Sequence, residues 1–283
     1  MQQLRRPLRT VLTIYLACYL LRVVEYFLLR TDQTFWGEAF LHKLAGIALL
    51  CFAARRLRIG PEALGFAGRG VLRHLLMGLG FGLGVFAIAY GAECWLVAAR
   101  GGDPVLRLYV TSYAVDRNAG MQTGAVFFLL CIAGNLLNVL MEEGVFRGLF
   151  QRLLEQKDAF LRSALTASLL FGLWHMVGPV RNYVDGLSSL GGAAANLVML
   201  VVTSGLVGFK YALVTRLTGS LYLAMGDHFV NNTIVNLLHV VSATGADEWM
   251  FLRVTIAQTL SFLIVLAVWL GRGRPRPLGA SAT

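Results

Sequence analysis

Charged residues are scarce in this chain of 283 residues, where they make up 14% of the sequence. Soluble proteins carry roughly 25% charged residues. Hydrophobic residues, by contrast, make up 57% of the chain. A water-soluble enzyme of this length needs more polar surface than so few charged side chains can supply. The composition therefore excludes a soluble fold.

Cysteine is also rare, and each of the four cysteines stands alone inside an apolar stretch. This distribution favours small buried side chains over disulfide partners or a metal cluster. The sequence also lacks an internal repeat and the His-Glu-x-x-His motif of helical zinc peptidases. The cysteines are Cys18, Cys51, Cys94 and Cys131.

Long apolar runs are abundant, in contrast to charged residues. Runs of about twenty residues cross a hydrocarbon core of roughly 30 Å. They predict an all-α, polytopic membrane protein of about eight transmembrane helices, folded as a single domain over residues 1–283. The predicted spans are 10–29, 35–54, 74–99, 124–152, 163–180, 193–214, 218–240 and 250–271.

The charge balance is basic, with a formal net charge of +10. The basic residues form short groups between spans and do not gather on one face, so the pattern argues against nucleic-acid binding. Sixteen basic residues lie on the side of both predicted termini and six on the other side, which predicts cytoplasmic termini. The chain has three lysines and 22 arginines. Such a ratio is typical of a GC-rich genome and favours a bacterial cytoplasmic membrane.

Several ionisable residues within the spans have simple structural explanations. Glu93 lies near the outer end of its span, where its carboxylate can reach water. Two other groups have helical spacing and can pair locally near a membrane edge. They are Arg22 with Glu25, and Glu38 with His42 and Lys43.

The fourth span differs because it carries two adjacent carboxylates. Glu142 and Glu143 point about 100° apart on a helix, so they cannot share one role. Glu143 and Arg147 have the i,i+4 spacing of an ion pair. Glu142 lies on another face, four residues after Asn138. A catalytic base and a spare acid beside a buried ion pair explain this segment equally well.

Two histidines in later spans favour the catalytic interpretation. At 1.5 Å per residue, Glu142, His175 and His228 lie about 15, 18 and 15 Å from the same membrane side. Asn232 shares a helix face with His228. A carboxylate and an imidazole can remove a proton from water, and a second histidine with an amide can stabilise an oxyanion. The set therefore predicts amide hydrolysis inside the helix bundle without a Ser or Cys nucleophile.

These residues resemble the motifs of the CPBP intramembrane proteases, also called the Abi or CAAX-protease family, which includes the CAAX prenyl endopeptidases. The resemblance covers about 124–240, the expected protease core. Three motifs occur in the family's order on separate spans. They are Glu-Glu-x-x-x-Arg at Glu142, Glu143 and Arg147, Phe-x-x-x-His at Phe171 and His175, and His-x-x-x-Asn at His228 and Asn232.

The resemblance implies an intramembrane endopeptidase of the glutamic type. It implies a substrate that is a membrane-associated peptide or protein, with the lipid bilayer as the other partner. The expected reaction needs no cofactor, and Zn²⁺ held by one glutamate and two histidines is the alternative. The implied roles are water activation by Glu142 and His175, an oxyanion hole from His228 and Asn232, and support from Glu143 and Arg147.

Two other function classes stay open. A non-catalytic member of the family serves as an immunity or interaction protein in the membrane. A proton-coupled carrier also places carboxylates and histidines at membrane depth. The first is disfavoured because all the motif residues are present, and the second because no half of the chain repeats the other.

Overall fold

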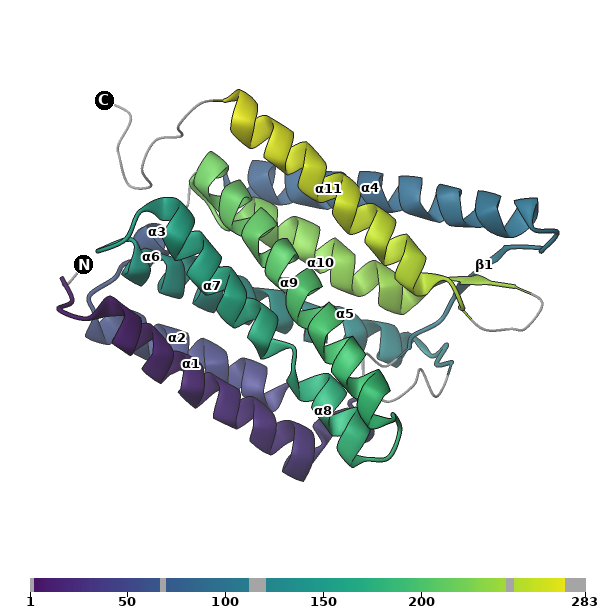
Figure 1. Cartoon of the computed structure of the whole chain (residues 1–283), viewed down its shortest axis with the longest axis horizontal. Helices are drawn as coiled ribbons and strands as arrows, with labels where there is room; N and C mark the ends of the chain where they lie inside the picture. The colour runs from purple at the N-terminus through teal and green to yellow at the C-terminus, as the bar shows by residue number, and fades with distance from the viewer. Residues whose placement is uncertain (1–2, 67–69, 112–120, 243–246, 273–283) are drawn as a thin grey trace.

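Long helices form a bundle in the computed structural model, which describes residues 3–66, 70–111, 121–242 and 247–272 (Figure 1). The chain enters with α1 (Pro7–Val24) and ends with α11 (Met250–Gly271). The first residues of α1 and the last residues of α11 lie at the same end of the bundle. We name this the terminal end, and the opposite end, where Ala99 lies, the far end. The all-α, polytopic membrane fold predicted from the sequence is confirmed.

Six helical stretches among the described residues are long and apolar enough to cross a membrane, so the predicted count of eight is not confirmed. The two predicted spans that fall short are α2 (Leu41–Arg56) and α10 (Tyr222–Leu237), of 16 residues each. A helix of that length extends about 24 Å, which is shorter than a typical hydrocarbon core. The six stretches are Pro7–Gln33, Val71–Ala99, Ala125–Leu154, Phe160–Val184, Leu190–Thr218 and Met250–Gly271.

The fourth predicted span is a continuous helical rod with a change of pitch. α5 (Ala125–Glu142) passes into the π-helix η3 (Glu143–Phe150), which passes into α6 (Gln151–Leu154). A π-helical segment inside an α-helix is rare and is frequently found at functional sites. Here the pitch changes between the two glutamates of the first motif.

Two other predicted spans are broken or shortened. The fifth divides into α7 (Phe160–Trp174) and α8 (Val177–Val184), and His175 is the first residue after α7. The seventh ends at Leu237, because the chain continues as β2 (Leu238–Val241). β2 pairs in antiparallel register with β1 (Val105–Leu108), a small sheet that the hydropathy did not predict.

The remaining elements complete the bundle. α1 continues as the π-helix η1 and the 3-10 helix η2, the long helix α4 packs against α10, and the long helix α9 packs against α7. The bounds of these elements and of the short helix α3 are η1 (Glu25–Leu29), η2 (Thr31–Gln33), α3 (Pro61–Leu64), α4 (Val71–Ala99) and α9 (Leu190–Thr218).

Close packing fixes α10 against α4. A Cβ atom added at Gly78 would lie 2.2 Å from the carbonyl oxygen of Leu223, and one added at Gly226 would lie 2.7 Å from the carbonyl oxygen of Leu75. Small residues of this kind let helix backbones approach within a membrane. The contact therefore holds the helix that carries the third motif in one position.

The outer surface of the bundle is apolar, as a protein surrounded by lipid requires. Large side chains on several helices are more than half exposed, including Leu16 at 63%, Leu129 at 66% and Leu270 at 71%. In water such a surface would aggregate. These side chains and the spanning helices identify an integral, multi-pass membrane protein.

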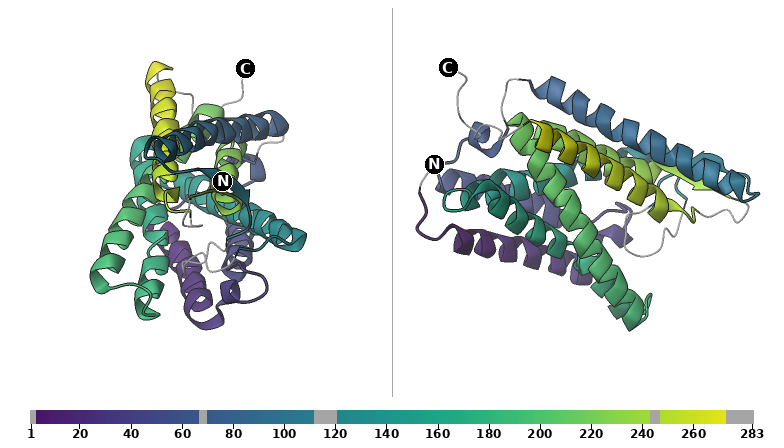
Figure 2. Two further views of the ribbon diagram at one scale, coloured as in Figure 1. Left: turned by 90° about the vertical axis from the view of Figure 1, so that its right-hand side faces the viewer. Right: turned by 45° about the horizontal axis from the view of Figure 1, so that its top comes forward.

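α9 and α11 meet near the terminal end and spread apart toward the far end, as the right-hand view of Figure 2 shows. Val214 and Val265 belong to one buried cluster where the two helices approach. Residues from the far halves of both helices line one cavity.

Candidate active site

A cavity of about 480 Å³ lies inside the bundle and collects the predicted catalytic residues. α5 contributes Asn138 and Glu142 to its lining, the break after α7 contributes His175, and α10 contributes His228 and Asn232. The side chains of Glu142, His175 and His228 thus line one cavity.

Glu142 is buried and is held by residues outside its own helix. Trp174 donates its indole N–H to Glu142 Oε1 over 2.9 Å. Arg22 Nη1 lies 3.8 Å from the same oxygen, and its guanidinium stacks 4.5 Å from the Trp174 ring centroid. Glu142 Oε1 is therefore occupied by contacts that position the carboxylate.

The tautomer of His175 follows from its position at the end of α7. Its Nδ1 lies 2.8 Å from the carbonyl oxygen of Phe171. A carbonyl can only accept, so Nδ1 carries the hydrogen and Nε2 of the neutral ring keeps its lone pair. His175 Nε2 is thus suited to accept a proton.

His228 lies between the two adjacent glutamates. Its Nδ1 donates to Glu143 Oε1 over 2.8 Å, and its Nε2 lies 3.6 Å from Glu142 Oε2. The second separation is longer than a direct hydrogen bond. The ring stacks on Tyr211 with 5.1 Å between centroids, which fixes its plane.

The predicted pair of Glu143 and Arg147 is present, with Nη1 and Oε1 3.3 Å apart. Both side chains are buried, and the Arg147 guanidinium lies 4.0 Å from the Phe171 ring centroid. The pair links the π-helix to α7. Because Glu143 also accepts a hydrogen bond from His228, the pair with Arg147 helps to fix the position of the His228 ring.

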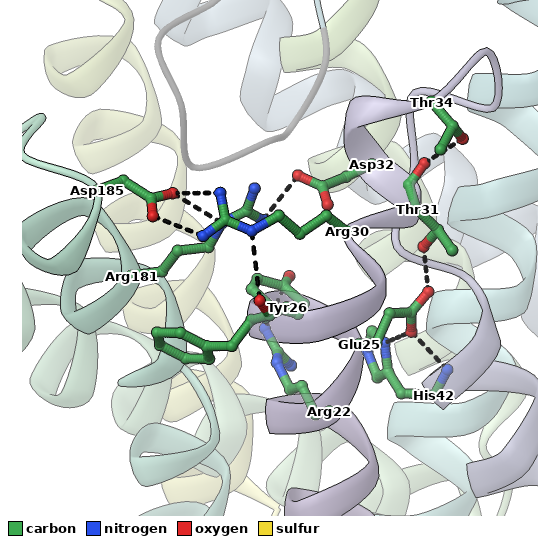
Figure 3. Close-up of polar contacts among 11 residues, drawn as sticks. Arg22, Glu25, Tyr26, Arg30, Thr31, Asp32, Thr34, His42, Arg181 and Asp185 are labelled. Carbon is green, nitrogen blue, oxygen red and sulfur yellow. Dashed lines mark hydrogen bonds and ion pairs between the residues drawn. The ribbon is translucent and has the colours of Figure 1, made fainter.

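The predicted local pair of Arg22 with Glu25 is wrong. Arg22 turns to Glu142, while Glu25 accepts from Nδ1 and the main-chain N–H of His42, each over 2.6 Å (Figure 3). Thr31 also donates to Glu25. Residues three apart on a helix can pair, but the long side chain of Arg22 also reaches the Glu142 carboxylate in another span.

A second set of ion pairs links η2 and the residue that follows η1 to α8 and the residue that follows it. Arg30 binds both carboxylate oxygens of Asp185, at 2.6 and 3.0 Å, and Arg181 Nη1 lies 2.8 Å from Asp32 (Figure 3). These ion pairs hold η2, which contributes Asp32 to the cavity lining, against α8.

Two further expectations about charged residues need correction. Glu93, predicted to reach water, is fully buried and accepts from Arg253 Nη1 over 2.6 Å. Lys210, counted among the basic residues that flank the spans, is fully buried in α9 and donates to Asp227 over 2.7 Å. Of the predicted group of Glu38 with His42 and Lys43, the pair of Glu38 with Lys43 is confirmed at 2.8 Å, whereas His42 pairs with Glu25.

Among the described residues, no three His, Cys, Asp or Glu side chains are grouped so that they could hold a metal ion. The four cysteines are unpaired in the part of the chain that the structure describes. Cys18 and Cys131 are buried as predicted, whereas Cys51 is exposed on α2.

Residues 124–234 match the family model of the Rce1-like, type II CAAX prenyl endopeptidases. The chain carries an Rce1-like region. This match confirms the resemblance to CPBP and CAAX proteases that the three motifs indicated, and at the level of the family it supports a CAAX-type intramembrane protease. No curated protein sequence matches the chain significantly.

The Rce1-like region contains all the predicted site residues, but the cavity extends beyond it. Trp174 and Tyr211 lie inside the region and were missed because an aromatic residue in a span is usually core. The place of Trp174, directly before His175, was the available signal. Arg22 lies outside the region, and only its position within an apolar run marked it.

The cavity reaches the surface of the bundle between α9 and α11. Its lining includes Thr203 and Leu206 on α9 and Thr255, Thr259 and Leu263 on α11, all of which are exposed. These two helices spread apart here (Figure 2). The cavity that contains the predicted site residues therefore borders the outer surface of the bundle between these two helices.

Proposed function

We propose that the protein is an intramembrane endopeptidase that hydrolyses a peptide bond in a membrane-associated peptide or protein, and that it needs no metal. The observation that supports this most directly is the convergence of Glu142, His175, His228 and Asn232 on one cavity. The Rce1-like match supports the reaction class.

The first step is activation of a water molecule. Glu142 Oε1 is used by Trp174, and His175 Nδ1 is used by Phe171. Glu142 Oε2 and His175 Nε2 are then the groups that orient the water, and one of them takes its proton. A base positioned in this way accelerates proton transfer by about 10²- to 10⁴-fold.

The second step is attack of the hydroxide oxygen on the carbonyl carbon. The carbonyl π electrons move to oxygen, and the oxyanion needs hydrogen-bond donors. His228 in its imidazolium form keeps Nδ1–H on Glu143 and offers Nε2–H, while Asn232 offers its amide NH₂ group. Glu142 and Glu143 flank that positive ring.

The third step is cleavage of the carbon–nitrogen bond. The proton taken from water passes to the leaving nitrogen as the oxyanion collapses back to a carbonyl. One product is a carboxylic acid and the other is an amine, so atoms and charge balance. Glu142 and His175 return to their starting state.

We further propose that both termini are cytoplasmic, from the excess of basic residues on the terminal side, and that the membrane is a bacterial cytoplasmic membrane, from the high ratio of arginine to lysine. Fusion of a reporter enzyme to each terminus tests the orientation. The proposal fails if either reporter is active only outside the cytoplasm.

The activity is tested by cleavage in purified membranes that carry the wild type, Glu142→Ala or His228→Ala. The probes are a quenched fluorescent peptide with a farnesylated CAAX end, its unprenylated twin, and the membrane's own proteins, searched for new termini. Cleavage by the wild type that both substitutions abolish is the expected result. Cleavage that survives both, or no wild-type product from any probe, contradicts the proposal.

Two controls sharpen this experiment. Glu62→Ala removes an exposed carboxylate on α3 and is expected to leave cleavage unchanged. A strong Zn²⁺ chelator is also expected to leave it unchanged, and loss of activity that added zinc restores would revive the metal alternative.

A further inference from the structure

Beside Asn232, a chain of polar side chains that also line the cavity begins at Lys210 in α9. Lys210 Nζ lies 2.7 Å from Asp227 Oδ2, 3.0 Å from Gln258 Oε1 and 3.0 Å from Ser261 Oγ. A lysine ammonium has three hydrogens and no lone pair, so it can only donate. Gln258 must therefore direct its amide oxygen, and not its NH₂ group, toward Lys210.

The orientation of the Gln258 amide determines the orientations of the next two amides, those of Asn231 and Asn232. With its oxygen held by Lys210, Gln258 donates through Nε2 to Asn231 Oδ1 over 2.6 Å. Asn231 then donates through Nδ2 to Asn232 Oδ1 over 2.9 Å. Each primary amide has one accepting end and one donating end, so fixing the first amide fixes all three.

The result is a defined orientation of the Asn232 amide. Its oxygen is used by Asn231, which leaves its NH₂ group as the end to offer to the cavity that Asn232 lines. An amide turned the other way would present a carbonyl lone pair to the oxyanion and repel it. Removal of one oxyanion donor lowers kcat by about 10²- to 10³-fold in other hydrolases.

We propose that Lys210, Gln258 and Asn231 are positioning residues that orient the Asn232 amide as an oxyanion donor. The inference rests on the proposed function, in which Asn232 binds the oxyanion. It extends the site to α11, because Gln258 lies beyond the matched residues 124–234. It also explains why a lysine is buried in α9 beside the third motif.

Gln258→Glu and Gln258→Leu separate orientation from structure. The glutamate still accepts from Lys210 but cannot donate, so Asn231 must turn its NH₂ group to it and the Asn232 amide turns in response. The leucine releases Asn231 without reversing it. We expect kcat for the cleaved probe to fall by about 10²-fold with Gln258→Glu and less with Gln258→Leu, with KM within about twofold of wild type in both.

A purely structural role predicts the opposite order. Leucine leaves Lys210 without one of its acceptors, whereas glutamate keeps that contact and the side-chain shape. Equal kcat values for the two variants, or a lower kcat for Gln258→Leu, would overturn the inference. Thermal unfolding of each variant shows whether the fold is retained.

Asn231→Asp gives an independent variant on α10. A carboxylate at this position accepts from Gln258 and also attracts the Asn232 NH₂ group, so the amide turns away from the oxyanion. We expect a loss in kcat similar to that of Gln258→Glu. Asn196→Asp, the same change at a half-buried position of α9 away from the cavity, is the control and should leave kcat unchanged.

Double variants distinguish failure of this inference from failure of the proposed function. In an Asn232→Ala background, Gln258→Glu should lower kcat no further, because residues that act through one group are not additive. If Asn232→Ala lowers kcat and Gln258→Glu in the wild type does not, only the positioning inference fails. If Asn232→Ala leaves kcat unchanged, the oxyanion role in the proposed function fails and the inference with it.

Discussion

Two buried polar clusters in this bundle are built from the same residue types and differ in what they face. Both contain glutamate, arginine and histidine within membrane-spanning or adjoining elements. The Arg253 cluster consists of Glu93, His239, Asp247 and Arg253. The Glu142 cluster consists of Glu142, Glu143, Arg147, His175 and His228.

The residues of the Arg253 cluster contact one another and do not face the cavity. Arg253 donates to Glu93 and Asp247 over 2.6 Å each, and His239 contacts Asp247 at 3.0 Å and the carbonyl oxygen of Tyr109 at 3.1 Å. None of its four residues is among the described residues that line the cavity. Its contacts join α4, α11 and the β-strands at the far end.

The Glu142 cluster is open. Glu142, His175 and His228 line the cavity, and Glu142 Oε2 and His228 Nε2 are 3.6 Å apart, too far for a direct bond. The comparison shows that ionisable residue types at membrane depth do not by themselves mark a site. A cavity beside groups with an unused lone pair or proton is the additional requirement.

Glu142→Gln and Glu93→Gln test this difference most strongly. Glu142→Gln should lower turnover by about 10²- to 10⁴-fold because the base is lost. Glu93→Gln should leave turnover per folded molecule unchanged. Both are measured as kcat on the cleaved probe, and a retained kcat in the first variant or a matching loss in the second breaks the comparison.

Arg253→Met should show the reverse pattern. Removing one partner of a buried pair costs about 3–5 kcal/mol, since Glu93 and Asp247 remain buried without their arginine. Thermal unfolding in detergent measures the loss, with the exposed Arg272→Met as the control. An unfolding midpoint equal to that of the control would show that the cluster does not stabilise the fold.

Trp174→Phe should have an intermediate effect on catalysis. It removes the N–H that positions Glu142 and keeps an aromatic ring against Arg22. Hydrogen bonds to charged groups contribute about 1.5–3 kcal/mol, so kcat should fall at least about tenfold. Trp95→Phe, at a site exposed on α4, is the matched change, and equal kcat values in the two variants would refute the role of Trp174.

Asp247→Asn should have the smallest effect, and one that depends on pH. Burial raises the pKa of this carboxyl, but hydrogen bonds from His239 and Arg253 outweigh it, so the pKa lies below its ordinary value. The lowered pKa stabilises the folded state above about pH 4, and that contribution disappears as the pH falls through the folded-state pKa.

The measurement is the difference in unfolding midpoint between wild type and Asp247→Asn across pH 7 to 3. A difference of about 2–4 °C, which corresponds to roughly 1 kcal/mol in a chain of this size, should be constant near neutral pH and shrink in acid. A difference that grows in acid would mean that Asp247 is not held ionised by its neighbours.

The sequence predicted the helical elements with unequal success. The eighth predicted span, 250–271, coincides with α11 at both ends, since the apolar run stops where the helix stops. The seventh extends three residues too far because three of the four residues in Leu238–Val241 are apolar, but the segment forms a strand. Hydropathy records burial and not backbone conformation, so it cannot separate the two.

Partners within the site were predicted where they are local and missed where they are distant. Glu143 and Arg147 are four residues apart on one helix, and they are paired. The contact of Glu142 with Trp174 joins residues 32 positions apart, and no spacing rule links them. The same holds for Lys210 and Gln258, on different helices.

The sequence by itself determined that the chain is an all-α membrane protein and that its few ionisable residues at depth form three motifs. It could do so because lipid exposure dictates composition, and helical spacing relates residues within one span. Only the tertiary structure decided which glutamate faces the cavity, which nitrogen of each histidine is in use, and which way the Asn232 amide points. Those properties depend on hydrogen bonds between helices, whose direction is set by partners far away in the chain.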